Sequence, residues 1–87
     1  MVRIGRKPVM NYVVACVTLF NHGAKQVLVR ARGQTISKAV DVVEMLRRSF
    51  VKNLEIASTV VGSEEITRFN GRSASISTIE ILLDKKD

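Results

Sequence analysis

Acidic residues are absent from the first forty positions of this chain of 87 residues. The first acid is Asp41, and the net charge of +6 comes from the part that precedes it, because the remainder carries seven basic and eight acidic residues. A charge excess confined to one part of a chain indicates a partner of opposite sign, and nucleic acid is the leading class of polyanion. The basic residues of the acid-free part are Arg3, Arg6, Lys7, Lys25, Arg30, Arg32 and Lys38.

Cysteine occurs only once, at Cys16, so no disulfide can form within the chain. This count fits a reducing compartment. We expect Cys16 to be a small buried hydrophobic residue, because its neighbours are apolar. A nucleophilic cysteine would need a histidine and an acid beside it, and we expect the only histidine, His22, at the surface end of a helix.

The sequence also lacks the motifs of catalytic and metal sites. It has no histidine–cysteine or histidine–carboxylate spacing typical of a metal site, and no Gly-x-x-x-x-Gly-Lys-Ser/Thr phosphate loop. Paired acids in an apolar pocket are not predicted either, and we expect Glu64 and Glu65 to face solvent. We therefore expect no enzyme activity, no cofactor and no bound metal.

Long apolar runs are missing as well, although the uncharged segment 8–24 follows three basic residues and superficially resembles a signal peptide. This segment contains Asn11, Thr18, Asn21 and His22. It is shorter and more polar than the run of about 20 apolar residues that spans a membrane. We interpret it as a buried helix, and we expect a cytoplasmic protein without a membrane partner.

Apolar residues make up 46% of the chain, which is enough for one small domain. A domain of this size buries only about 60–65% of the surface of its unfolded chain. The many valines and isoleucines therefore predict that some apolar surface is buried in an oligomer interface.

Hydrophobic periodicity predicts the order strand, helix, strand, helix, strand, strand. We expect strands at 2–5, 26–32, 54 to about 67 and 73–83. The first helix begins at Pro8 and ends before Gly23, and Thr35 or Ser37 caps the second. The expected core positions are Val9, Tyr12, Val13, Cys16, Val17 and Phe20 in the first helix and Ile36, Ala39, Val40, Val43, Leu46 or Arg47, and Phe50 in the second.

The last two strands are expected to form a long hairpin. Gly62 predicts a bulge or bend, and Asn70-Gly71 predicts a tight turn in which both residues have positive φ. Residues 84–87 are expected to form a solvated tail. We predict an α+β fold, a two-layer sandwich with two helices on one face of a four-stranded mixed sheet, as a single nucleic-acid-binding domain (1–87) whose hairpin arm protrudes at about 63–75.

Basic residues cluster at two predicted junctions. Arg6 and Lys7 lie between the first strand and the first helix, where a helix N-terminus favours an anion. Arg30 and Arg32 share one face of the second strand, about 6.6 Å apart, which is close to the phosphate repeat of a nucleic-acid strand. Lys38 follows soon after. Each group taken alone is equally consistent with a solvated charged surface.

A third basic group flanks the predicted turn of the hairpin. Arg68 and Arg72 lie on either side of it, and a two-stranded ribbon with a basic tip can enter a groove of a duplex. The alternative is an exposed hairpin that its charges keep soluble. Phe69 either stacks on a base or wedges into a base step, or packs against its own hairpin.

Four segments, in this order, resemble the Alba family of archaeal chromatin proteins: 4–13 (IGRKPVMNYV), 30–33 (RARG), 36–41 (ISKAVD) and 77–81 (STIEI). The resemblance runs nearly from end to end. It implies a dimer with the fold of the C-terminal domain of a bacterial translation initiation factor. It also implies association with the chromosome and binding to duplex DNA and RNA without marked sequence preference.

The resemblance assigns roles to individual residues. Arg6 and Lys7 match the family's basic pair at the centre of the binding face, and Arg72 matches a basic residue on the arm that reaches along the minor groove. Arg32 and Lys38 match further phosphate contacts. The full predicted nucleic-acid-binding set is Arg6, Lys7, Asn11, Arg30, Arg32, Lys38, Arg68 and Arg72, and Phe50 matches an aromatic contact between neighbouring dimers.

Several positions depart from the family pattern. Arg6 stands where the family commonly has a lysine. In some members that lysine is an acetylation target, so this form of regulation is not expected to carry over to Arg6. Gln34 and Ser75 stand where basic residues are common, and Phe69 is unusual at a polar position of the hairpin. These differences reduce the charge of the arm and bear on the balance between DNA and RNA.

The sequence thus predicts a protein that binds and compacts double-stranded DNA as a homodimer, or as a heterodimer with a paralogue. It would act through phosphate contacts and minor-groove arms. The main alternative is an RNA-binding protein, either an RNA chaperone or a subunit of a ribonucleoprotein. A protein–protein module that uses the Val/Ile-rich faces, or an enzyme of unknown type, would belong to different classes.

Overall fold

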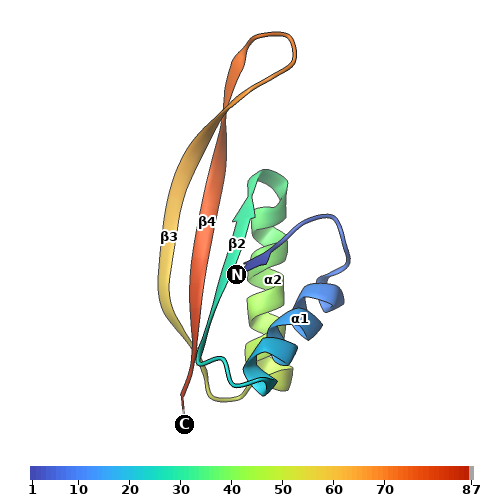
Figure 1. Ribbon diagram of the computed structural model, residues 1–87, viewed down its shortest axis with the longest axis vertical. Helices are drawn as coiled ribbons and strands as arrows, with labels where there is room; N and C mark the ends of the chain where they lie inside the picture. The colour runs from blue at the N-terminus through green and yellow to red at the C-terminus, as the bar shows by residue number, and fades with distance from the viewer. Residues whose placement is uncertain (87) are drawn as a thin grey trace.

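Two helices cover one face of a four-stranded mixed sheet in the computed structural model, which describes residues 1–86 (Figure 1). The predicted α+β class and the order of the main elements are therefore confirmed. The elements are β1 (Val2–Arg3), α1 (Val9–Asn21), β2 (Gln26–Arg32), the 3₁₀ turn η1 (Gly33–Thr35), α2 (Ile36–Met45), the π-helical turn η2 (Leu46–Phe50), β3 (Leu54–Thr67) and β4 (Ser73–Lys85).

The strands lie in the order β1-β2-β4-β3. β1 runs parallel to β2, whereas β4 is antiparallel to both of its neighbours. The pairing of β2 with β4 ends at Arg32 and Thr78, but β3 and β4 continue to pair up to Thr67 and Ser73. The far part of the β3–β4 hairpin therefore extends beyond the body, as Figure 1 shows.

The core lies between the helices and the sheet. The α1 stripe was predicted correctly, because Tyr12, Val13, Cys16 and Phe20 are all buried. They pack with the inward-facing residues of β2 and β4, among them Val29 and Leu83, which are inaccessible to solvent. Each large apolar side chain buried this completely contributes about 1.5–3 kcal/mol.

The ends of α1 also follow the sequence. Pro8 immediately precedes the first helical residue, and the chain leaves the helix through Gly23, whose φ of +99° is in the left-handed region. His22 is exposed at the C-terminal end, as expected for a surface residue. Cys16 is fully buried, and this burial raises the pKa of its thiol to about 11.

The core stripe of the second helix differs from the prediction. Val42 is completely buried, whereas Val40 and Phe50 are 45% and 49% exposed. The buried positions are Ala39, Val42, Val43 and Leu46, which form one face of a helix. The helix ends in the wider turn η2, where the amide of Val51 donates to the carbonyl of Leu46 at 2.7 Å, so that Phe50 turns away from this face.

The bulge in β3 was predicted at the wrong position. The register of β3 against β4 shifts between Ile56 and Ser58, while Gly62 pairs regularly with Thr78. A β-carbon at Gly62 would lie 3.3 Å from the Thr78 hydroxyl oxygen. Gly62 therefore relieves a close cross-strand contact and is not the site of the bulge.

The hairpin turn also differs from the predicted two-residue form. Positive φ occurs among the described residues only at glycines, so Gly71 has it (+83°) and Asn70 does not. The amide of Gly71 donates to the carbonyl of Arg68 at 2.9 Å, and the amide of Arg68 donates to the carbonyl of Arg72 at 2.8 Å. This is a three-residue loop with a glycine bulge, which requires positive φ only once.

Both ends of the sheet differ slightly from prediction. β1 is only two residues long, although the amide of Ile4 still donates to the carbonyl of Arg30. The solvated tail expected at 84–87 is wrong for Asp84 and Lys85, which continue β4, because the amide of Lys85 donates to the carbonyl of Lys25. Asp87 lies outside the described residues.

Candidate nucleic-acid interface

Basic residues gather at the end of the body where β2 stops. Because β1 and β2 are parallel, the loop that follows β1 (residues 4–8) reaches this same end of the sheet. Arg6 and Lys7 are exposed on this loop. Arg6, Arg30 and Arg32 line one surface concavity, so the structure brings together two groups of basic residues that are separate in the sequence.

The hydroxyl group of Tyr12 holds the loop from below. It accepts hydrogen bonds from the amides of Gly5 (2.9 Å) and Lys7 (3.1 Å). Tyr12 itself is buried in the core. A buried tyrosine hydroxyl normally finds a polar partner, and here that partner is the backbone of the candidate site.

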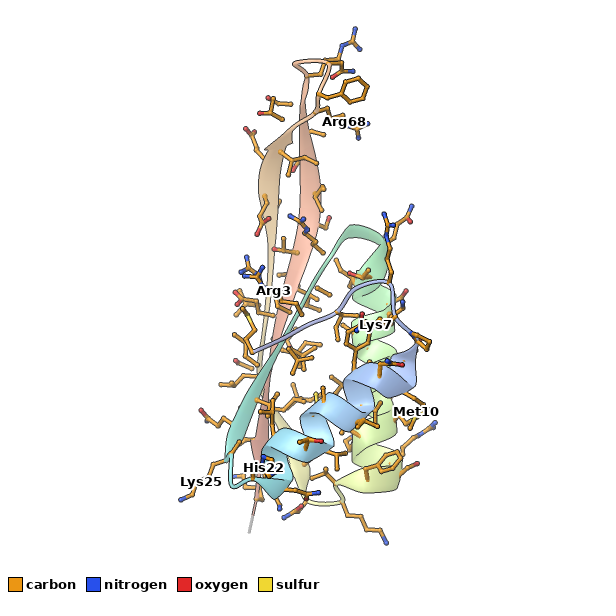
Figure 2. All side chains as sticks on the ribbon, turned by 45° about the vertical axis from the view of Figure 1, so that its right-hand side comes forward. Arg3, Lys7, Met10, His22, Lys25 and Arg68 are labelled. Atoms are coloured by element: carbon orange, nitrogen blue, oxygen red, sulfur yellow. The ribbon has the colours of Figure 1, made fainter. Side chains whose placement is uncertain are left out.

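Lys38 holds the same loop from the side of α2. Its ammonium group donates to the carbonyls of Gly5 (2.8 Å) and Lys7 (2.9 Å). Two of its three N–H donors are therefore used within the protein. The backbone around Arg6 and Lys7 is fixed by Tyr12 and Lys38 together, while the two basic side chains remain exposed (Figure 2, where Lys7 is labelled).

Arg30 and Arg32 lie on the sheet face opposite the helices, because Val27, Val29 and Ala31 alternate with them toward the core. Both are paired with Glu64 of β3: Arg30 donates to Oε1 at 2.6 Å and Arg32 to Oε2 at 3.4 Å. Glu64 therefore lies on the open face of the sheet with its side chain 36% exposed, but it is engaged in ion pairs and is not the freely solvated residue that the sequence suggested. Glu65 is exposed, as expected.

The tip of the hairpin is a separate basic group. Arg68 and Arg72 are exposed on either side of the turn, and Figure 2 shows Arg68 at the far end of the arm, away from Lys7. The five residue-to-residue steps from Thr78 to Ser73 span about 17 Å of strand, so the tip does not meet the concavity within one chain. Phe69 is fully exposed, which excludes the interpretation that it packs against its own hairpin.

The two remaining predicted site residues lie on the helices. Asn11 is exposed in the first turn of α1, close to the loop. Its backbone amide donates to the carbonyl of Pro8. Phe50 is exposed on η2, at the opposite end of the second helix from Lys38. It is therefore remote from the concavity.

Sequence reasoning missed Tyr12 and Glu64 as parts of this region. Tyr12 was identified only as a core residue, although its lone hydroxyl in an apolar stripe is a sequence signal for a buried hydrogen bond. Glu64 gave no such signal, because its partners lie more than thirty residues away along the chain.

Metal ligands do not converge anywhere in residues 1–86: no three His, Cys, Asp or Glu side chains are placed to hold an ion. Within the same residues, neither helix has the length and apolar character needed to cross a membrane.

This chain is similar to known proteins over nearly its whole length. The sequence model described as Alba matches residues 1–63. The "DNA/RNA-binding protein Alba" of Methanocella arvoryzae is 46% identical over 82 residues, which cover 94% of this chain and 85% of that protein. The structure of Alba from Thermoplasma volcanium is similar with a TM-score of 0.91 and 42% identity, over 95% of this chain and 96% of the other. The crystal structure of ALBA1 from Trypanosoma brucei is similar with a TM-score of 0.78 and 29% identity, over 99% and 68%.

Proposed function

Because this chain belongs to the Alba family, we propose that it is a sequence-tolerant nucleic-acid-binding protein that binds and compacts double-stranded DNA as a dimer. The observation that carries the proposal is the loop fixed by Tyr12 and Lys38, which presents Arg6 and Lys7 to solvent beside the arginines of β2. Exposed guanidinium and ammonium groups bind phosphates without reading bases. The similarity to a protein named for DNA and RNA binding supports the same class, which is not enzymatic.

Dimerisation is supported by apolar surface that a single chain leaves uncovered. β3 is an edge strand, and Ile56, Val60 and Val61 are exposed along it. A monomeric protein of this size rarely leaves a contiguous apolar edge in water. In a two-fold dimer, two copies of the Arg6–Lys7 loop would lie on one face, and the partner would be a second copy or a paralogue.

The arms would extend this face. The β3–β4 hairpin reaches beyond the body with Arg68 and Arg72 at its tip, and a two-stranded ribbon of this kind fits a duplex groove. We assign the arms to the minor groove and the loops to the phosphate backbone. Phe50, exposed far from the loop, would contact the next dimer along the DNA, and the protein would lie on the chromosome in the cytoplasm.

A salt titration tests this proposal. If a dimer neutralises about six to ten phosphates, its affinity for duplex DNA falls by about 10³–10⁵ between 50 and 200 mM salt, because counterions are released on binding. Duplexes of unrelated sequence should give the same slope. An affinity for duplex DNA that does not depend on salt would contradict the proposal.

The fully exposed Phe69 favours a second candidate, an RNA chaperone or ribonucleoprotein subunit. Aromatic side chains stack on unpaired bases, which structured RNA offers in its loops and duplex DNA does not. Competition between duplex DNA and structured RNA at one salt concentration separates the candidates. Preferential RNA binding that is lost in Phe69→Leu would support the RNA role.

A further inference from the structure

Four arginines line the concavity beside the β1–α1 loop: Arg3, Arg6, Arg30 and Arg32. Among its described lining residues, only Glu64 is acidic. Within this lining, four positive charges are therefore accompanied by one carboxylate. The pairing of β1 with β2 places two of these positive charges side by side, because Arg3 is the register partner of Arg30.

The carboxylate of Glu64 is bound as a phosphate group would be. One of its oxygens accepts from Arg30 at 2.6 Å, and the other accepts from Arg32 at 3.4 Å. A phosphodiester also offers two non-bridging oxygens that share one negative charge, and guanidinium groups bind both kinds of anion. Glu80 is the register partner of Arg30 on the adjacent strand β4, whereas Glu64 lies one strand further away on β3. The described ion pairs of Arg30 and Arg32 are nevertheless both formed with Glu64.

The contact is open enough to be displaced. The side chains of Arg30 and Glu64 are each 36% exposed, and that of Arg32 is 63% exposed. Ion pairs this accessible to water contribute little to folding stability. A nucleic-acid strand that also contacts Arg6 and Lys7 would gain several phosphate contacts in exchange for this one internal pair.

We propose that Arg30 and Arg32 form a phosphate subsite that Glu64 occupies in the free protein, and that a nucleic-acid phosphodiester displaces this carboxylate on binding. This inference rests on the proposed function. Glu64 is then an internal competitor that lowers the affinity for every nucleic acid. It disfavours ligands with few phosphates most, because they cannot compensate for the broken ion pair through the loop.

Two neighbouring glutamates allow a matched test of this proposal. Glu64→Gln and Glu65→Gln change the net charge equally and lie on the same strand, but Glu65 is exposed and points to the other face of β3. We expect Glu64→Gln to bind a given duplex about fivefold more tightly than Glu65→Gln at the same salt concentration, as the loss of one competing surface ion pair would allow.

The same comparison in a variant that carries Arg30→Gln and Arg32→Gln shows whether the arginines cause the difference. There the advantage of Glu64→Gln over Glu65→Gln should disappear. Equal affinities of the two glutamine variants in the otherwise unaltered protein would overturn the subsite, and so would an advantage that persists without the arginines. If even the unaltered protein fails to bind nucleic acid, the proposed function fails, and the subsite fails with it.

Discussion

At the scale of single residues, two side chains make contacts that the sequence patterns did not predict. Tyr12 belongs to the apolar stripe of α1, but its hydroxyl also accepts from two amides of the exposed loop. Lys38 was predicted to contact phosphates, yet two of its donors hold the same loop. Tyr12 therefore connects the loop to the core, and Lys38 connects it to α2.

We predict that Tyr12→Phe weakens nucleic-acid binding although it removes no charge. The amides of Gly5 and Lys7 lose their partner, so the free energy of unfolding should fall by about 1–2 kcal/mol and the loop should become less ordered. Urea denaturation and duplex binding measure the two effects. Ile81→Val, which costs about 0.5–1.5 kcal/mol in the core of β4, is the control. A Tyr12→Phe affinity equal to that of Ile81→Val would contradict a positioning role.

Cys16 should make folding stability depend on alkaline pH. Burial raises the pKa of its thiol from 9.0 to about 11, and the positive amino terminus partly opposes this shift. Because the unfolded chain ionises the thiol at lower pH than the folded protein does, the free energy of unfolding should fall as pH rises from about 9 to 11, by up to about 2–3 kcal/mol. Below pH 9 this contribution is constant.

The Cys16→Ala variant isolates this contribution, because all other groups titrate in both proteins. Denaturation across this pH range should show a shallower loss of stability in the variant. The same loss in both proteins would mean that the thiol is not protected from solvent.

At the scale of elements, hydrophobic periodicity and turn residues predicted those features of the helices and strands that depend on residues close together in the chain. The stripe of α1 and the bounds of β2 and β3 were predicted correctly. α1 and β2 show clear apolar periodicity and are followed by glycines, and β3 is rich in β-branched residues. The end of the second helix was not predicted correctly, because the π turn that exposes Phe50 alters the helical period. The bulge of β3 depends on its pairing with β4, which no local pattern contains.

The hairpin turn gives a prediction at this scale. Gly71→Ala should destabilise the arm by about 1–2 kcal/mol, because an alanine at positive φ is strained. Asn70→Ala should cost less, since Asn70 has negative φ and loses only its side-chain acceptor for the amide of Arg72. Hydrogen exchange measures this directly: the arm amides should lose protection in Gly71→Ala while the core of α1 and β2 keeps it. Equal effects of the two variants would indicate the two-residue turn.

At the scale of the whole molecule, most of the basic residues of the acid-free part lie together at one end of the sheet. The acid-free part supplies the loop with Arg6 and Lys7 and the end of β2, and the parallel pairing of β1 with β2 brings them together. The sequence could predict this convergence from the strand–helix–strand order. It could not predict that Glu64 lies against Arg30 and Arg32, because β4 separates β3 from β2 in the sheet.

The central claim is that Arg6 and Lys7 bind phosphates and do not read bases. The most direct test measures the affinities of the unaltered protein and of the double variant Arg6→Ala/Lys7→Ala for several duplexes of unrelated sequence at one salt concentration, and then repeats the measurement across a salt series. We predict that the double variant binds every duplex more weakly by the same factor, and that its salt dependence becomes less steep by about one unit for each phosphate that it no longer neutralises. A weakening confined to particular sequences, or unchanged affinity for all of them, would contradict the account.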